Sequence, residues 1–298
     1  MICKNIGELI GHTPVISLKD GKNEILVKLE FTNPGGSAKD RAALQMIDEA
    51  EQAGKLKPGG VIIEPTSGNM GVALAMIGAA RGYKVIIVMP DSMSVERRKL
   101  ISAFGAKLVL TDGSLRMQGA IDKANELSKT IEGSFIPMQF DNPANARAHE
   151  KTTGEEIIED TDGKLDGFVA GIGTGGTFTG ISRALKKKIP GIVCAAMEPA
   201  ESAVISGKPA GPHGIQGIGA GFIPKNYDSS VADRVITVKT DDALAMTKIL
   251  AQKYGLLVGI SSGAAVCAAR ELAGEIGDGA RVLCIAPDTG ERYLSVLY

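Results

Sequence analysis

The chain has 298 residues, of which 44% are hydrophobic and 22% charged, a composition typical of folded globular proteins and not of disordered ones. Its 33 Lys and Arg against 34 Asp and Glu leave a net charge of -1, so no cationic field recruits nucleic acid or an anionic membrane. The longest clean apolar run, 72–80, is far shorter than the ~20 residues that span a bilayer, and no secretory signal is visible. We therefore expect a cytoplasmic protein with neither nucleic-acid nor membrane partners.

Short β-branched runs alternate with segments of helical periodicity along the chain. The predicted strands are 25–30, 61–64, 85–89, 107–111, 167–170, 192–197, 235–238 and 282–286. The predicted helices are 40–53, 69–81, 95–104, 115–131, 147–159, 177–188, 241–253 and 262–276. Strand-helix alternation with near-continuous apolar strands indicates parallel sheets covered by helices on both faces, which is the α/β class.

A domain boundary is predicted at 137–145, where two prolines and three Asp or Asn residues interrupt the alternation. Two α/β lobes would then flank a cleft. The four cysteines are scattered without a C-x-x-C pair, so they suggest neither a zinc site nor a disulfide framework, and we expect buried thiols and no metal.

Lys39 lies in the turn-rich segment N-P-G-G-S-A-K-D-R, at the predicted start of a helix. The positive end of the helix dipole disfavours a protonated amine, which suits a lysine that must attack a carbonyl as a neutral nucleophile. A solvated lysine at a helix start is the plain alternative.

The segment E-P-T-S-G-N-M-G (64–71) runs from a strand through a loop into a helix. Its amides with the Ser and Asn side chains could cradle a carboxylate or a phosphate. An ordinary helix N-cap built from Thr, Ser or Asn explains the same residues.

The segment G-I-G-T-G-G-T (171–177) follows a strand and opens a helix, so its NH groups and hydroxyls predict an anion site. Gly171, Gly173 and Gly176 also satisfy G-x-G-x-x-G, with Glu198 about 20 residues further on, as in a dinucleotide-binding fingerprint. This loop alone leaves the cofactor open. Two further loops (258–263 and 287–293) look like capped helix starts, and the glycine-rich 211–221 is either a mobile lid or a static loop.

Seven motifs in order resemble the cysteine synthases (O-acetylserine sulfhydrylases), a family of the tryptophan-synthase-β type, fold type II, of pyridoxal-phosphate enzymes. They are N-P-G-G-S-x-K-D-R, T-S-G-N-x-G, M-P-D-S-M-S-x-E-R-R (89–98), Q-F-x-N-P-A-N (139–145), G-T-G-G-T, G-I-S-S-G-A-A and G-E-R-Y-L-S (290–295). The resemblance spans nearly the whole chain, whereas the dinucleotide interpretation explains one motif.

The resemblance implies pyridoxal 5'-phosphate as cofactor and a role for each matching residue. Lys39 would be the Schiff-base lysine and the base for the α-proton. The cofactor would also contact Asn69 at its 3'-oxygen, Ser261 at its ring nitrogen and, at its phosphate, Gly173, Thr174, Gly175, Gly176 and Thr177. The substrate would contact Thr66, Ser67, Gly68, Met70 and Gln139.

The resemblance also implies the reaction: O-acetyl-L-serine loses acetate to give an α-aminoacrylate, to which sulfide adds to form L-cysteine. The smaller, mobile lobe would comprise 35–145, and the larger one, carrying the phosphate loop, 1–34 plus 146–298, with the cofactor in the cleft between them. The family is usually homodimeric, and a serine acetyltransferase tail is a further expected partner. Met70 replaces the usual second threonine, which leaves open an enzyme that uses serine and homocysteine or that releases sulfide from cysteine.

Overall fold

The strands form two sheets, one in each of two units, within residues 2–92 and 95–297, which this computed structural model describes. Unit 1 comprises 1–10 and 39–144, and unit 2 comprises 11–38 and 145–298. The units differ from the sequence-based division at 1–10, which fall in unit 1, and at 35–38 and 145, which fall in unit 2. The first ten residues differ for a clear reason. These residues belong with unit 1 because Ile6 and Ile10 pack against its core.

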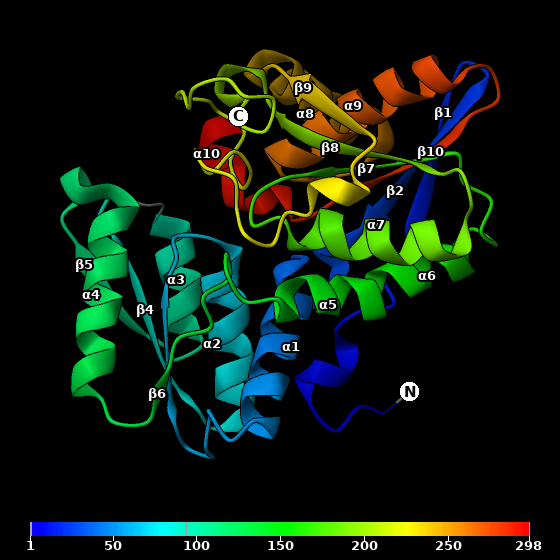
Figure 1. Ribbon diagram of the computed structural model, residues 1–298. Helices are drawn as coiled ribbons and strands as arrows, with labels where there is room; N and C mark the ends of the chain where they lie inside the picture. The colour runs from blue at the N-terminus through cyan, green and yellow to red at the C-terminus, as the bar shows by residue number, and fades with distance from the viewer. Residues whose placement is uncertain (1, 93–94, 298) are drawn as a thin grey trace. The chain divides into compact units, whose positions relative to one another are not determined.

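Unit 1 is built on a four-stranded parallel sheet in the order β5-β4-β3-β6 (Figure 1). Ile62 and Ile63 are neighbours in β3 but belong to separate cores, because successive strand side chains point to opposite faces. The helix α4 covers the face of Ile63, whereas α1 and α2 contribute to the core of Ile62. The bounds are β3 (Val61–Pro65), β4 (Lys84–Pro90), β5 (Lys107–Thr111), β6 (Ser134–Phe135), α1 (Lys39–Gln52), α2 (Asn69–Arg81), α3 (Val95–Ala103) and α4 (Arg116–Thr130).

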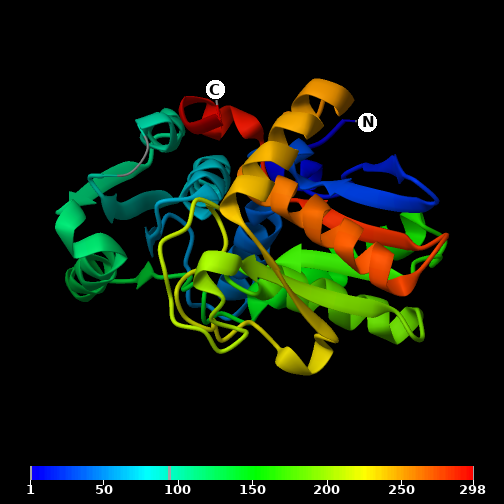
Figure 2. The same cartoon turned by 90° about the horizontal axis from the view of Figure 1, so that it is seen from above.

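Unit 2 is built on a six-stranded sheet in the order β1-β2-β10-β7-β8-β9, parallel except for the β1-β2 pair. Leu26 and Val27 of β2 again belong to opposite cores. Figure 2 looks down on α8 and α9, which cover one face, while α6 and α7 lie on the other (Figure 1). The bounds are β1 (Val15–Asp20), β2 (Asn23–Leu29), β7 (Gly167–Gly171), β8 (Val193–Pro199), β9 (Arg234–Val238), β10 (Arg281–Ala286), α5 (Ala144–Lys151), α6 (Thr153–Asp160), α7 (Gly176–Lys188), α8 (Thr240–Tyr254), α9 (Ile260–Ile276) and α10 (Leu294–Leu297).

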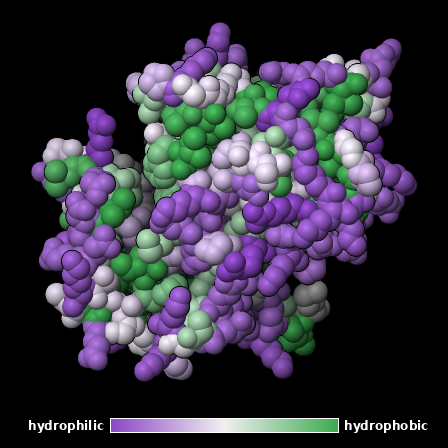
Figure 3. All heavy atoms as spheres, in the orientation of Figure 1, coloured by the Kyte–Doolittle hydropathy of each residue, from purple (hydrophilic) through white to green (hydrophobic). Residues whose placement is uncertain are grey.

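The outer helices of unit 2 are amphipathic. Phe178, Ile181 and Leu185 of α7 are buried in the core beneath the sheet, whereas Lys187 and Glu150 pair on the surface. Figure 3 shows hydrophilic side chains over most of the region of α6 and α7. Burial of one apolar stripe therefore fixes the face that each helix turns to the sheet.

The structure confirms the α/β class, with parallel sheets covered by helices. Each predicted strand overlaps an observed one, but β1 and the two-residue β6 were missed. The single helix predicted at 147–159 is wrong. Two helices, α5 and α6, meet at Thr152, whose φ of -122° and ψ of -74° leave the helical region while its hydroxyl donates to the carbonyl of Ala148.

Further sequence-based expectations concern the cysteines, membrane-spanning helices and metal sites. Cys194 and Cys284 are buried as expected, but Cys3 and Cys267 are only half-buried. Within the described ranges no helix is long and apolar enough to cross a membrane, and no group of three or more acidic, His or Cys side chains could hold a metal ion. Met93 and Ser94 of the motif 89–98 lie outside the described residues.

Candidate active site

Lys39 is the first residue of α1, and the segment before it is tied to the chain that follows β10. The backbone N of Ala38 donates to the carbonyl of Pro287 at 2.8 Å, and Ser37 forms a β-bridge with Asp288. These contacts hold the backbone up to Ala38 at the carboxyl end of β10. Lys39 is half-buried at this helix start, and its bond to a cofactor stays a prediction.

The loop after β3 places Thr66, Ser67 and Gly68 at the N-terminus of α2. Thr66 N donates to the carbonyl of Val88 at 3.0 Å, and its hydroxyl accepts from Gly68 N at 3.3 Å. Gly68 itself is the N-cap residue and makes no side-chain cap. The ordinary cap built from Thr, Ser or Asn is therefore absent at this helix start, whose first-turn amides suit an anion.

Met70 is buried, with only 1% of its surface exposed, and its side chain belongs to the core of unit 1. That core comes from α1, α2 and the facing side of the sheet. Met70 therefore packs as a core side chain of unit 1. A role of Met70 toward the substrate stays a prediction.

Gln139, the other predicted carboxylate ligand of unit 1, lies beside Glu64 near the end of β3. Gln139 N and Met138 N donate to the two carboxylate oxygens of Glu64 at 3.3 Å and 3.1 Å. Burial raises the pKa of the Glu64 carboxyl to about 7, opposed by hydrogen bonds from Gln139 and Met138. The structure thus brings Gln139 and the Thr66 loop to one end of one strand, and Glu64 is a partner that the sequence did not single out.

The loop 173–177 follows β7 in unit 2 and opens the 13-residue helix α7. A Cβ added to Gly173 would lie 2.3 Å from the carbonyl oxygen of Gly217, and one added to Gly176 would lie 2.2 Å from Asn145 Oδ1. Only glycine permits this close packing of the loop. Because the first-turn amides of α7 have no partner within the helix and its dipole favours negative charge, the loop fits a phosphate group.

Two polar side chains orient the hydroxyls of this loop, and sequence reasoning assigned a role to neither. Asn145 Nδ2 donates to Thr174 Oγ1 at 2.9 Å. His149 Nε2 lies 3.1 Å from Thr177 Oγ1. Asn145 ends the motif 139–145 and His149 follows one helical turn later on α5, so the motif was a usable signal for Asn145 alone.

The glycine-rich stretch 211–221 packs beside the same loop. Gly219 N donates to the carbonyl of Ile172 at 2.9 Å, and the position of a Cβ on Gly217 lies 4.0 Å from Ser261 Oγ. Ser261 is buried in the first turn of α9. The stretch therefore lies between the phosphate-type loop and Ser261 within unit 2.

Glu198, the acidic residue of the dinucleotide alternative, is already engaged by its own loop. Its carboxylate accepts from Ile205 N at 2.8 Å and from Ser206 N at 2.9 Å, and it is 2% exposed. A ribose-binding carboxylate must face its ligand. The contacts of Glu198 therefore do not favour a dinucleotide.

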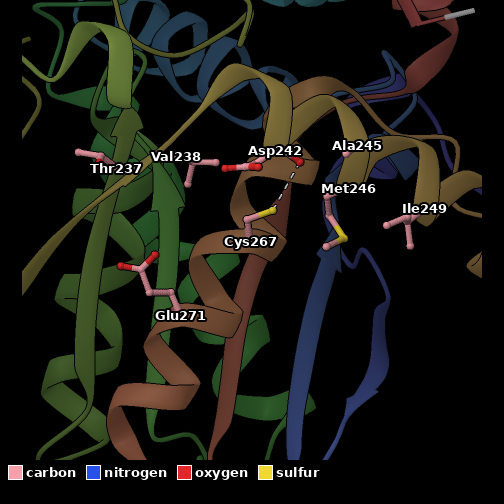
Figure 4. A pocket seen from close by; sticks show the side chains of 8 residues that line it. All are labelled: Thr237, Val238, Asp242, Ala245, Met246, Ile249, Cys267 and Glu271. Atoms are coloured by element: carbon pink, nitrogen blue, oxygen red, sulfur yellow. Dashed lines mark hydrogen bonds between the residues drawn. The ribbon is translucent and has the colours of Figure 1, made fainter.

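A hollow of about 300 Å³ lies elsewhere in unit 2, among β9, α8 and α9 (Figure 4). Cys267 lines it, and its thiol donates to the carbonyl of Asp242 at 3.7 Å. Burial raises the pKa of this thiol to about 11, so it is not a ready nucleophile. None of the predicted site residues lines this hollow.

Comparison with known proteins identifies the family. Residues 6–288 match the family of pyridoxal-phosphate dependent enzymes, and the chain belongs to that family. A cysteine synthase of Staphylococcus aureus (strain Mu50 / ATCC 700699) is 52% identical over 296 residues, which cover 98% of this chain and 95% of that protein.

Solved structures agree with this fold. The crystal structure of O-acetylserine sulfhydrylase isoform 3 from Entamoeba histolytica matches with a TM-score of 0.96 and 48% identity, covering 100% of this chain and 92% of that one. A hydrogen sulfide-producing enzyme from Fusobacterium nucleatum matches with a TM-score of 0.95 and 45% identity, covering 99% of each chain. The same scaffold thus carries more than one named activity.

Proposed function

We propose that this chain is a cysteine synthase that joins sulfide to the three-carbon unit of O-acetyl-L-serine and releases acetate. The observation that carries the proposal is the loop 173–177, where close-packed glycines and oriented hydroxyls at a helix N-terminus suit the phosphate of the cofactor. The 52% identity to a cysteine synthase over nearly the full length supports the choice of reaction.

In this proposal the cofactor is held by four groups of the chain. Lys39 would hold its aldehyde carbon, Asn69 its ring oxygen, Ser261 its ring nitrogen, and the loop 173–177 its phosphate. The bound cofactor supplies an electron sink for the carbanion formed at the substrate α-carbon. A serine hydroxyl opposite the ring nitrogen does not keep that nitrogen protonated, which suits an elimination in which the leaving group takes the electrons.

The chain's own groups bind the amino acid and move its proton. Thr66, Ser67, Gly68 and Gln139 bind the α-carboxylate, the first three from the start of α2 and Gln139 from the loop before α5. The ε-amine of Lys39, freed when the amino group of the substrate takes its place, accepts the α-proton. The Cβ–O bond to acetate then breaks and a Cβ–S bond to sulfide forms. Lys39 returns the proton to the α-carbon, so the proton balance of the reaction closes.

We further propose a cytoplasmic homodimer, with the C-terminal tail of a serine acetyltransferase as a partner. The localisation, the homodimer and this partner are proposed from the resemblance to cysteine synthases. Size-exclusion chromatography with light scattering tests the dimer, and titration with a synthetic tail peptide tests the partner. A monomer contradicts the proposed homodimer, and no binding at millimolar peptide contradicts the proposed partner.

The test of the function compares wild type with Lys39→Ala. Purified wild type should show the visible absorption of bound cofactor, lost on borohydride treatment, and should form cysteine from O-acetylserine and sulfide faster than from O-phosphoserine or serine. Lys39→Ala should abolish turnover and keep the melting temperature, whereas Lys22→Ala, an exposed lysine paired with Asp278, should keep both. Turnover of Lys39→Ala within tenfold of wild type would sink the assignment.

A further inference from the structure

Glu64 is a buried carboxylate that takes no part in the proposed reaction. It is the penultimate residue of β3 and only 1% exposed. A carboxylate is rarely this buried unless partners satisfy it. Its partners are the backbone NH groups of Met138 and Gln139 and the side chain of Gln139.

The loop that supplies these partners has an unusual backbone. Met138 adopts a φ of +57° although its side chain is 54% exposed and gains little from packing. Its carbonyl accepts from Asp141 N and Asn142 N, both at 2.9 Å, so the chain reverses tightly after it. A left-handed non-glycine residue persists only where its surroundings fix it. The two hydrogen bonds to Glu64 fix Met138, which is the left-handed residue, and Gln139, which follows it.

We propose that Glu64 is the positioning residue for Gln139: it holds the loop 137–142 so that the Gln139 amide is presented to the carboxylate of the amino-acid substrate. The inference rests on the proposed function, since Gln139 has a substrate only if the chain acts on an amino acid. Glu64 itself touches no substrate.

The charges around Glu64 leave its ionisation to burial and to this loop. In β4, Lys84 lies opposite Val61 in the strand register, at the far end of β3 from Glu64. In α2, Arg81 forms ion pairs with Asp48 and Glu51. Asp141 is half-buried in the loop itself. Among the described residues, α4 adds charged groups that are exposed or half-buried: Arg116, Asp122, Lys123, Glu126 and Lys129.

Two effects of pH follow, and they run in opposite directions. The ionised carboxylate accepts from every donor of the loop, whereas the protonated form places a hydrogen among those donors. Because the pKa of folded Glu64 is about 7, above its ordinary 4.5, substrate binding weakens as pH falls through 7. The same shift means that the native state binds the proton more tightly, so the free energy of unfolding decreases as pH rises from 4.5 to 7.

The first experiment is a double-mutant cycle of Glu64→Gln and Gln139→Ala. Glu64→Gln keeps the size of the side chain but turns an NH2 group toward backbone donors, so KM for O-acetyl-L-serine should rise about tenfold, with kcat changed less than twofold. The double variant should be no worse than Gln139→Ala alone, because Glu64 acts through Gln139. Additive losses, or a fall in kcat with KM unchanged, would overturn the proposal.

The matched control is Glu198→Gln, another buried carboxylate that accepts two consecutive backbone NH groups after a strand. In wild type and in this control, KM should rise as pH falls from 8 to 6 while the melting temperature rises. In Glu64→Gln both trends should be lost. The same trends in Glu64→Gln would assign them to another group and overturn the proposal.

Amide hydrogen exchange supplies a readout that needs neither substrate nor turnover. Protection of the Met138 and Gln139 amides in the holoenzyme should fall at least about tenfold in Glu64→Gln at a fixed pH. If that variant does not fold, wild type at pH 6 and pH 8, corrected for the intrinsic rate, carries the same comparison. Unchanged protection overturns the anchoring. If wild type fails to use O-acetyl-L-serine while the protection falls, the proposed function fails and the anchoring stands.

Discussion

The imidazole Nε2 of His149 lies 3.1 Å from Thr177 Oγ1, while its Nδ1 lies 2.9 Å from Thr153 Oγ1. The ring is fully buried on α5, so it joins the first residue of α6 to the first turn of α7. His149→Ala removes the group that orients the Thr177 hydroxyl, and affinity for the cofactor should fall about tenfold, the worth of one hydrogen bond to a charged group. Equilibrium dialysis of pyridoxal phosphate against the apoenzyme measures it. Lys187→Ala, on the solvent side of α7, is the control, and equal affinity for all three proteins would contradict the expectation.

Gly176 gives the sharpest test of the phosphate loop. An added methyl group would lie 2.2 Å from Asn145 Oδ1, so even Gly176→Ala must displace the side chain that orients Thr174, and Gly176→Leu should lose the cofactor altogether. Gly274→Ala is the control, because nothing lies within 4 Å of its added Cβ in α9 and alanine favours a helix by about 1 kcal/mol. Full cofactor occupancy in Gly176→Leu, read from absorption, would show that the loop is only a turn.

Met70→Thr should destabilise the protein without improving the binding of any amino acid. The substitution removes a buried thioether from the core of unit 1 and buries a hydroxyl, which costs about 2 kcal/mol or more of the free energy of unfolding. Urea unfolding and titration of cofactor absorption with O-acetylserine, serine and cysteine measure the two effects. Tenfold tighter binding of one ligand would instead place this side chain in the substrate pocket.

Lys28 is fully buried in β2 and bonds Glu156 Oε2 at 3.0 Å, Asp160 Oδ2 at 2.8 Å and the carbonyl of Thr13 at 2.6 Å. Lys28→Ala leaves two carboxylates side by side without their cation, so the free energy of unfolding should fall by about 3 kcal/mol. The triple variant Lys28→Met, Glu156→Gln, Asp160→Asn removes all the charges and should recover part of that loss in urea. Because methionine restores the packing of the lysine stem, the matched control is Lys28→Met alone, and no gain of the triple variant over it would show that the unpaired carboxylates cost little.

The strands could be predicted because their signal is local. Alternation of side chains such as Ile62 and Ile63 lies within a few residues, and it follows from backbone geometry alone. The break at Thr152 was missed because the helical periodicity of 147–159 continues through it. The burial of Met70 could have been predicted from the sequence, because α2 is apolar on nearly all sides and such a helix is buried all round.

The partners of the site residues could not be predicted in the same way. Glu64 and Gln139 are 75 positions apart, and His149 and Thr177 are 28 apart, so only the folded chain brings them together. Neither Glu64 nor His149 belongs to one of the seven motifs that carry the resemblance. Resemblance named the residues expected to contact cofactor and substrate, but it did not name those that orient them.

The place of β2 between β1 and β10 has a consequence for synthesis on the ribosome. Val27 pairs with Cys284, so one edge of an apolar strand stays open until almost the whole chain has been made, roughly 10–50 s after β2 itself at ordinary translation rates. The strands of unit 1, by contrast, all lie between residues 61 and 135 and can pair as soon as they emerge. Open apolar strand edges invite aggregation. We therefore expect a truncation that stops before residue 281 to leave this edge of β2 unpaired and the chain prone to aggregation, which a solubility assay of the truncated chain measures.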